Sequence, residues 1–184
     1  ELKSMILNYY TEKNYYNQIE VKNLNKQLIN LIVAGYDNAA AGVNKTCTVD
    51  AVLWKDAKTY LNRIEDYLHH INISKFGFEI YPYTDYDTVN INTYSASFEG
   101  EYGWHNDFIL GERIYDNKLT FVMNISEEEY TGGEFQFFLN EPVTIDDRPG
   151  SIIIFPSWTQ HRVLPVKSGE RKSLSFWIKG PKFT

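Results

Sequence analysis

The sequence has a single cysteine, Cys47, only four histidines, and no apolar run long enough to form a membrane helix. One cysteine excludes an internal disulfide and a cysteine-rich metal site. The longest apolar stretches, such as residues 152–155, have the length of a buried strand, whereas a membrane helix needs about 20 apolar residues. We therefore expect a soluble protein without a membrane partner, located in the reducing environment of the cytoplasm.

Positive charge is also scarce, because 18 lysines and arginines face 24 aspartates and glutamates for a net charge of −6. Sequence-independent binding of nucleic acid depends on lysine and arginine at the phosphates, so we expect no nucleic-acid partner. The chain begins at Glu1 rather than Met. We interpret this as a trimmed or processed N-terminus, and nothing there resembles a signal peptide.

The pattern of apolar residues changes near residue 75. Before that point, residues 56–71 repeat apolar side chains at three- and four-residue steps, which predicts an amphipathic helix. A weaker helix is expected over residues 22–33, with Gly35 placed to end it, and residues 47–54 are expected to be extended. No linker or internal repeat divides the chain, so we predict one domain over residues 1–184. Residues 1–75 would form a helical support region and residues 76–184 the core.

After residue 75 short apolar runs alternate with glycine- and proline-containing turns, which predicts strands. The expected strands span residues 76–81, 88–96, 118–125, 134–139, 143–145, 151–155, 161–166 and 172–178. About eight short strands after a helical beginning indicate a mainly β fold with N-terminal helices, a barrel or jelly roll. Such a fold would equally suit a binding domain that performs no chemistry.

Two of the four histidines lie in informative surroundings, whereas His69 and His70 close the expected helix and are interpreted as surface residues. His105 and Asp107 are two residues apart, so in an extended segment both side chains point the same way. His161 follows the apolar run 152–155 and is expected near the start of a strand. Two imidazoles and one carboxylate on one face of a metal leave open positions, as in oxygenases that use ferrous iron.

Arg171 lies ten residues after His161, at the beginning of a predicted strand. A hairpin with its turn at residues 167–169 would carry Arg171 back toward the metal. The planar guanidinium can bind a carboxylate with two parallel hydrogen bonds. Ser173 lies two residues further along and shares the same face, so its hydroxyl can donate a further hydrogen bond.

The order of these elements resembles the 2-oxoglutarate- and iron-dependent dioxygenases of the prolyl 4-hydroxylase type. The resemblance covers residues 89–178, about half of the chain, with spacing typical of the family. The matching elements in chain order are His105-Asn106-Asp107, Gly132-Gly133-Glu134, Pro149-Gly150, the strand Ser151 to Phe155, Phe155-Pro156, His161, Pro165-Val166, Gly169-Glu170-Arg171, Ser173 and Trp177.

The resemblance implies a double-stranded β-helix, the jelly-roll or cupin-like barrel, with His105, Asp107 and His161 as ligands of Fe(II). It implies that Arg171 holds the far carboxylate of the co-substrate 2-oxoglutarate, while O₂ is the second co-substrate and ascorbate a supporting reductant. Tyr94, eleven residues before His105, falls where such enzymes often have a tyrosine that hydrogen-bonds the co-substrate. Packing in the core is an equally good interpretation of Tyr94.

The resemblance implies a hydroxylase of a protein or peptide residue, with proline favoured. Two departures bear on the substrate. Asn117-Lys118 stands where peptidyl prolyl hydroxylases tend to carry an arginine, and Trp177 stands where nucleic-acid dealkylating relatives carry a second arginine. A hydroxylase of a small free metabolite therefore stays open. So does a non-catalytic barrel that binds a ligand or a structural metal. Tyr102, Trp104 and the tyrosines at 81, 83 and 86 are either a substrate rim or scattered surface aromatics.

Overall fold

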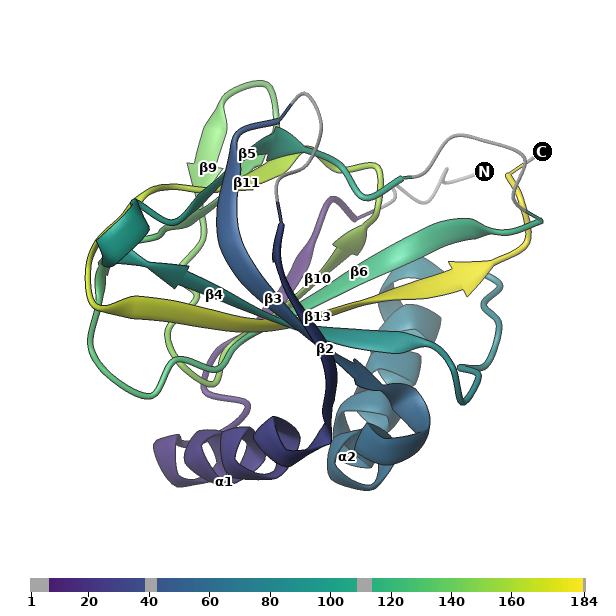
Figure 1. The fold of residues 1–184 in the computed structure, drawn as a ribbon. Coiled ribbons are helices and arrows are strands. Elements are labelled where there is room, and N and C mark those ends of the chain that lie inside the picture. The colour runs from purple at the N-terminus through teal and green to yellow at the C-terminus, as the bar shows by residue number, and fades with distance from the viewer. Residues whose placement is uncertain (1–6, 39–42, 109–113, 184) are drawn as a thin grey trace.

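The computed structural model describes residues 7–38, 43–108 and 114–183. A curled antiparallel sheet packs one face against two α-helices, as Figure 1 shows. The helices are α1 (Gln18–Leu28) and α2 (Trp54–Ile71), with short helical turns η1 (Ile29–Leu31), η2 (Asn72–Phe76) and η3 (Ala96–Phe98). The strands are β1 (Tyr10–Glu12), β2 (Ile32–Asn38), β3 (Lys45–Leu53), β4 (Thr88–Ser95), β5 (Glu101–His105), β6 (Asp116–Asn124), β7 (Thr131–Gly132), β8 (Phe135–Phe138), β9 (Pro142–Thr144), β10 (Ile152–Pro156), β11 (His161–Val163), β12 (Val166–Ser168) and β13 (Glu170–Gly180).

The strands form two connected walls that share β3. The larger wall runs β1-β10-β6-β13-β4-β3, with β2 paired to the outer edge of β3. The smaller wall runs β3-β5-β11-β8-β9. Residues 48–53 of β3 pair with β4, whereas Lys45 and Thr46 at its beginning pair with β5. The first two residues of β3 therefore belong to the smaller wall, and the curl of the sheet places the two walls opposite each other (Figure 1).

Alternation along the central strands decides which side chains face the helices. In β6, Leu119, Phe121 and Met123 pack into a cluster with the buried faces of α1 and α2. Val122, on the opposite face of the same strand, belongs to a second cluster with Phe155 of β10 and with Phe135 of the smaller wall. Both faces of β6 are thus covered, and all nine of its residues are buried. The side chains between the two walls are the ones available to form a site.

The two helices are stabilised by local sequence and by burial. Asn17 caps α1, since its side chain accepts hydrogen bonds from the backbone of Ile19 and Glu20, and the Glu20 carboxylate accepts one from the Asn17 amide. This capping box contributes roughly 1 kcal/mol. Helix α2 buries the stripe that its periodicity predicts, comprising Trp54, Ala57, Leu61, Ile64, Leu68 and Ile71. The helices therefore support the larger wall from outside.

The mainly β fold with N-terminal helices is confirmed, whereas several predicted boundaries are wrong. Helix α1 ends at Leu28 and Gly35 lies within β2 rather than at a helix end. Residues 76–81 are not a strand, although the Tyr81 amide donates to the Lys179 carbonyl. The strand predicted at 161–166 is two strands, β11 and β12. Strands β1, β2 and β3 precede residue 76 and join the sheet, so the expected helical region also supplies strands.

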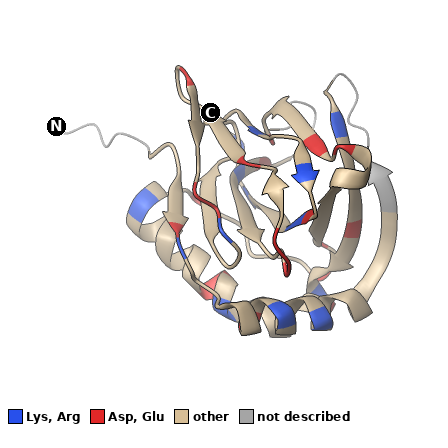
Figure 2. Ribbon diagram, turned by 90° about the vertical axis from the view of Figure 1, so that its left-hand side faces the viewer, with Lys and Arg blue, Asp and Glu red and all other residues tan. Residues whose placement is uncertain are grey.

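Charged residues of both signs are interspersed along the described chain, as Figure 2 shows, with several lysines and arginines on the helices. This distribution does not test whether the protein binds nucleic acid, so the expected absence of such a partner stays a prediction. His69 is half-buried and His70 is exposed at the end of α2. Among the described residues, neither helix combines the length and the hydropathy that crossing a bilayer requires.

Candidate metal centre

His105 and His161 lie directly opposite each other on neighbouring strands. β5 ends at His105, β11 begins at His161, and the two residues are register partners. Their imidazole centroids are 4.1 Å apart. Asp107 follows β5 by two residues, and its amide donates to the Ser157 carbonyl over 2.8 Å. The pairing of β5 with β11 therefore brings together side chains that are more than fifty residues apart in sequence.

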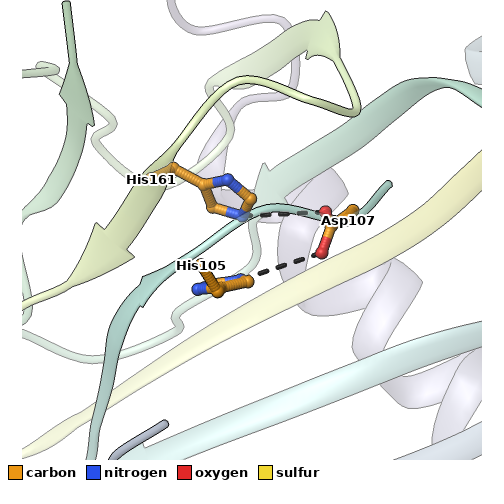
Figure 3. Close-up of side chains that lie close together, drawn as sticks. All are labelled: His105, Asp107 and His161. Atoms are coloured by element: carbon orange, nitrogen blue, oxygen red, sulfur yellow. Dashed lines mark ion pairs between the residues drawn. The ribbon is translucent and has the colours of Figure 1, made fainter. Parts of the chain in front are cut away.

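The three side chains converge on one point, as Figure 3 shows. His105 Nε2 is 3.7 Å from Asp107 Oδ1, and His161 Nε2 is 3.6 Å from Asp107 Oδ2. One potential ligand atom from each residue lies within 4.8 Å of the others. The side chains are 5–12% exposed. Two imidazoles and one carboxylate with this spacing fit a divalent first-row metal that keeps open coordination positions.

Backbone carbonyls fix the orientation of both imidazoles. His105 Nδ1 lies 2.8 Å from the Gly103 carbonyl, and His161 Nδ1 lies 3.0 Å from the Thr159 carbonyl. A carbonyl oxygen only accepts, so each Nδ1 carries the proton and each Nε2 presents a lone pair toward Asp107. Burial, followed by the neighbouring His161, lowers the pKa of His105 to about 3. At neutral pH His105 is therefore in the neutral form that binds metal.

The carboxylate of Asp107 is held by residues of the larger wall. Thr120 Oγ1 in β6 donates to Asp107 Oδ2 over 2.9 Å. Since that proton is used, the Ser157 hydroxyl, 3.0 Å from Thr120 Oγ1, donates to Thr120. Asn117 Nδ2 donates to the Asp107 carbonyl over 2.9 Å. Sequence reasoning missed this support, although a threonine within the otherwise apolar run 119–123 was a visible signal.

Arg171 lies across the cavity from this cluster and is completely buried. In β13 it is the register partner of Tyr94 in β4. Its Nη2 donates to Asp147 Oδ2 over 2.6 Å, while Nε and Nη1 have no hydrogen-bond partner among the described residues. Buried polar groups are nearly always hydrogen-bonded. The unsatisfied donors therefore fit an acceptor, such as a carboxylate, that binds beside the guanidinium, which is the expected role of Arg171.

Asp147 is an unpredicted member of the site. Burial raises the pKa of its carboxyl group, and the Arg171 guanidinium opposes that rise. The guanidinium stays protonated because the nearby carboxylate and hydroxyls raise its pKa above the already high ordinary value. A neutral Asp147 would leave a buried cation without its counter-charge, at a cost of roughly 3–5 kcal/mol. The Asp147–Arg171 contact is therefore a buried ion pair.

A glycine allows Arg171 to take this place. Gly133 has φ of +69°, and a Cβ there would lie 3.1 Å from Arg171 Cδ and 3.0 Å from Val166 Cγ2. A left-handed backbone and a close approach both favour glycine. The Gly-Gly pair noted in the sequence thus makes room for the arginine side chain.

The predicted site residues line one cavity of about 210 Å³ between the walls. It contains His105, Asp107, His161, Arg171, Tyr94 and Ser173, together with Thr120, Trp177 and Lys45. Tyr94 is buried, and burial raises the pKa of its hydroxyl, so the group stays protonated. The cavity thus combines a metal-ligand set at one end with a buried guanidinium, a tyrosine hydroxyl and a serine hydroxyl. This donor set fits Fe(II) together with a dicarboxylate.

A second hollow of about 470 Å³ adjoins the cavity. The two share Tyr102, Asp107 and Trp177. Trp177 Nε1 is buried without a hydrogen-bond acceptor within the described part of the chain. Tyr86 and Tyr102 line this hollow, whereas Tyr83 packs in the core against Trp54 and Phe176. The tyrosines discussed from the sequence are therefore partly a rim and partly structural.

Another hollow, of about 1060 Å³, lies elsewhere. It is lined by acidic residues including Glu127, Glu128, Glu129 and Asp146. The histidines and Asp107 do not line it. Its size alone gives no reason to place chemistry there, and the smaller cavity with the convergent ligands is the candidate site.

Comparison with known proteins agrees with this geometry. A family model described as the 2OG-Fe(II) oxygenase superfamily matches residues 89–179. A PKHD-type hydroxylase from Hyphomonas neptunium is 39% identical over 93 residues, which cover 46% of this chain and 41% of the relative. The match thus spans about two fifths of the length of that relative.

Solved structures match over nearly the whole chain. A viral collagen prolyl hydroxylase from Paramecium bursaria Chlorella virus-1, in a 2OG complex, has a TM-score of 0.72 at 19% identity and covers 95% of this chain and 97% of its own. A prolyl hydroxylase from Trichoplax adhaerens, in complex with a hypoxia inducible factor peptide fragment, has a TM-score of 0.70 at 18% identity and covers 93% and 83%. At these identities the likeness concerns the fold, and the expected double-stranded β-helix is confirmed.

Proposed function

Since the chain belongs to the 2OG-Fe(II) oxygenase superfamily, we propose that it is an Fe(II)- and 2-oxoglutarate-dependent dioxygenase that hydroxylates a residue of a protein or peptide, with proline favoured. One observation carries the proposal. The metal-ligand set and the unsatisfied guanidinium of Arg171 line the same cavity. A fold that only binds ligand has no need of both features together.

His105, Asp107 and His161 hold the Fe(II) in this proposal. The bound metal, with O₂ and 2-oxoglutarate, supplies an oxidation that converts a C–H bond to C–OH while the co-substrate becomes succinate and carbon dioxide. The protein fixes geometry. The carbonyls of Gly103 and Thr159 hold the imidazole protons on Nδ1, and Thr120 aims the carboxylate of Asp107. Such supporting contacts orient ligands and tune the metal.

Arg171 binds the far carboxylate of 2-oxoglutarate through the free hydrogens of its guanidinium. The guanidinium is already held at Nη2 by Asp147, so little side-chain freedom is lost when the carboxylate binds. Tyr94 and Ser173 offer hydroxyl donors to the same ligand from neighbouring strands. With one end bound by Arg171, the other end of the co-substrate is aligned with the metal, which is catalysis by positioning.

The adjoining hollow is the proposed site of the primary substrate. It reaches Asp107 and is bounded by Tyr102 and Trp177, so a group placed there would lie beside the metal. The Trp177 indole offers an unsatisfied N–H to a carbonyl or other acceptor of the substrate. The names of the relatives support a peptide substrate, since they are a PKHD-type hydroxylase, a collagen prolyl hydroxylase and a prolyl hydroxylase with a peptide fragment.

One observation favours the alternative of a small free metabolite. Peptidyl prolyl hydroxylases tend to carry an arginine where this chain has Asn117-Lys118. Here Asn117 supports the Asp107 backbone, and the Lys118 ammonium lies 3.2 Å from the centroid of the Phe183 ring. Neither side chain is available to replace that arginine at a peptide. The free metabolite is therefore kept as the alternative, while proline is favoured on the names of the relatives.

Succinate release from purified protein given Fe(II), ascorbate and 2-oxoglutarate tests the activity. We expect release that His161→Ala abolishes and that His70→Ala, at the exposed end of α2, leaves unchanged. Absence of release from iron-loaded wild type would contradict the oxygenase and favour a binding protein. Mass spectrometry of co-expressed proteins and of free metabolites, each searched for a gain of one oxygen atom, distinguishes a protein substrate from a metabolite. Oxygen on prolyl residues supports the proposal, whereas oxygen only on free metabolites supports the alternative.

A further inference from the structure

Lys45 is a cation in the wall of the cavity that the proposed function does not use. It begins β3, where the strand belongs to the smaller wall, and its register partner is Tyr102 in β5. The Lys45 ammonium lies 4.3 Å from the centroid of the Tyr102 ring. The Tyr102 ring in turn stacks on His105 with centroids 3.4 Å apart. Lys45 is thus at the metal end of the cavity, opposite in position to Arg171.

The charge of Lys45 has no carboxylate in salt-bridge contact within the part of the chain that the structure describes. The Lys45 ammonium instead contacts the face of the Tyr102 ring. Burial lowers the pKa of the ammonium, and the more distant Cys47 and Asp107 oppose that effect. Asp107 is a proposed metal ligand, so its charge is committed elsewhere. A half-buried lysine in this position is stabilised when a further anion enters the cavity.

The charges of the occupied site show which anion this is. A divalent metal carries two positive charges and Asp107 one negative charge, so together they leave one positive charge. The ion pair of Arg171 with Asp147 is neutral, so Arg171 brings no excess positive charge to the ligand. A 2-oxoglutarate dianion therefore leaves one negative charge unbalanced in a site sheltered from water. Lys45 carries the single positive charge that restores the balance.

We propose that Lys45 is a co-substrate-binding residue, which supplies the second cation for 2-oxoglutarate at the metal end of the cavity while Arg171 binds the far end. This inference rests on the proposed function, because it concerns the same ligand. The reason is the ion pair of Arg171 with Asp147, which neutralises the positive charge that Arg171 would otherwise offer to 2-oxoglutarate. A charge-assisted hydrogen bond or close ion pair in a cavity this sheltered is stronger than its counterpart in water.

Calorimetric titration of 2-oxoglutarate into Fe(II)-loaded protein without oxygen tests the role directly. We expect Lys45→Met to raise the Kd for 2-oxoglutarate about tenfold, the size of one charge-assisted contact. Lys45→Arg, which keeps the charge, is expected to stay within about threefold of wild type. The matched control is Lys172→Met. Lys172 follows Arg171 in β13 but lines a different hollow, beside α1, and its loss leaves the Kd unchanged.

A second ligand locates the effect. 2-Oxopentanoate keeps the keto acid but has a methyl group in place of the far carboxylate. We expect Lys45→Met to weaken binding of both ligands, because both place a keto-acid carboxylate at the metal end, and to weaken 2-oxoglutarate more, because only the dianion leaves a negative charge unbalanced. Arg171→Met is expected to weaken only 2-oxoglutarate. A loss confined to 2-oxoglutarate in Lys45→Met overturns the placement at the metal end. Thermal unfolding of each variant confirms that it is folded, and Lys45→Gln replaces Lys45→Met if that variant does not fold.

The failures of the two proposals are distinguishable. If iron-loaded wild type does not bind 2-oxoglutarate, the proposed function fails. If wild type binds and Lys45→Met binds equally well, only the role of Lys45 is overturned. In that case a loss of turnover with acidic peptides but not with their amide counterparts would assign Lys45 to the primary substrate instead.

Discussion

Arg171 Nη2 donates to Asp147 Oδ2 over 2.6 Å, and both side chains are buried. The guanidinium is therefore fixed before any ligand binds, while Nε and Nη1 have no hydrogen-bond partner among the residues that the structure describes. A fixed donor loses less conformational freedom on binding than a mobile one. The same contact lowers the net charge that Arg171 offers to a dicarboxylate. Orientation and charge are thus provided by different residues, which makes the roles of the pair separable by mutation.

Arg171→Met tests the structural side of this pair. Removal of the guanidinium leaves Asp147 buried without its counter-charge, so we expect a loss of roughly 3–5 kcal/mol in the free energy of unfolding. The double variant Arg171→Met/Asp147→Asn removes both charges and should recover most of that loss. Urea unfolding measures both. Asp146→Asn, whose side chain pairs with exposed Lys13 and Arg148, is the control and should cost less than about 1 kcal/mol.

The affinity of the same variants for 2-oxoglutarate distinguishes a role of Arg171 in binding from its role in stability. The double variant should remain unable to bind 2-oxoglutarate with wild-type affinity although its stability is recovered, because no guanidinium is present. Recovery of both properties together would show that Arg171 has only a structural role.

Thr120→Val tests the support of the metal ligand. Valine has nearly the shape of threonine but cannot donate to Asp107 Oδ2, so the carboxylate loses the bond that aims it. We expect the Kd for Fe(II) or Mn(II) to rise by about 10- to 100-fold. Thr93→Val, which is in β4 but lines the hollow beside α1, is the control and should keep wild-type affinity. Equal metal affinities in the two variants would contradict a supporting role for Thr120.

The sequence allowed His105, Asp107, His161 and Arg171 to be proposed as site residues because each stands in a local pattern, and the structure brings them to one cavity. His105 and Asp107 share a face by alternation, and His161 and Arg171 stand at strand beginnings that apolar runs announce. They meet in one cavity because the strands that the patterns indicate pair with one another. The same alternation predicted the buried stripe of α2 and most strands of the core.

Lys45 and Asp147 were not predictable in this way. Lys45 reaches the metal end because β3 begins in the smaller wall and continues in the larger one, and no short pattern marks that change. Asp147 lies in a loop 24 residues before Arg171, among several other acids. Gly35 misled for a related reason. Its position after an amphipathic run is typical of a helix end, but pairing with Asp50 of β3 places it in a strand.

Trp177→Phe tests the proposed substrate hollow. Phenylalanine keeps an aromatic ring but lacks the buried, unsatisfied Nε1 donor. We expect hydroxylation of the primary substrate to fall by about 5- to 100-fold, the effect of losing one buried hydrogen bond, while succinate release without substrate persists. The ratio of hydroxylated product to succinate measures this. Trp158→Phe, at a partly exposed position, serves as the control. A parallel loss of both products would indicate damage to the co-substrate site instead.

Gly150 connects the N-terminal segment to the strand that precedes the proposed metal ligand His161. The Tyr16 amide donates to the Gly150 carbonyl over 3.0 Å, and the Gly150 amide donates to Asn124 over 2.8 Å. Gly150 has φ of +85°, and a Cβ there would collide with the Tyr16 carbonyl. Gly77 has φ of +71° but open space around its would-be Cβ.

Alanine substitution at these two glycines separates backbone strain from collision. Both variants adopt a left-handed conformation that alanine disfavours, at a cost of about 1 kcal/mol each. Only Gly150→Ala must also displace the Tyr16 backbone, so we expect it to lose about 3 kcal/mol or more of the free energy of unfolding. Urea unfolding of the two variants measures the difference. Equal losses would mean that the N-terminal segment moves aside freely and does not stabilise the sheet that carries the metal ligands.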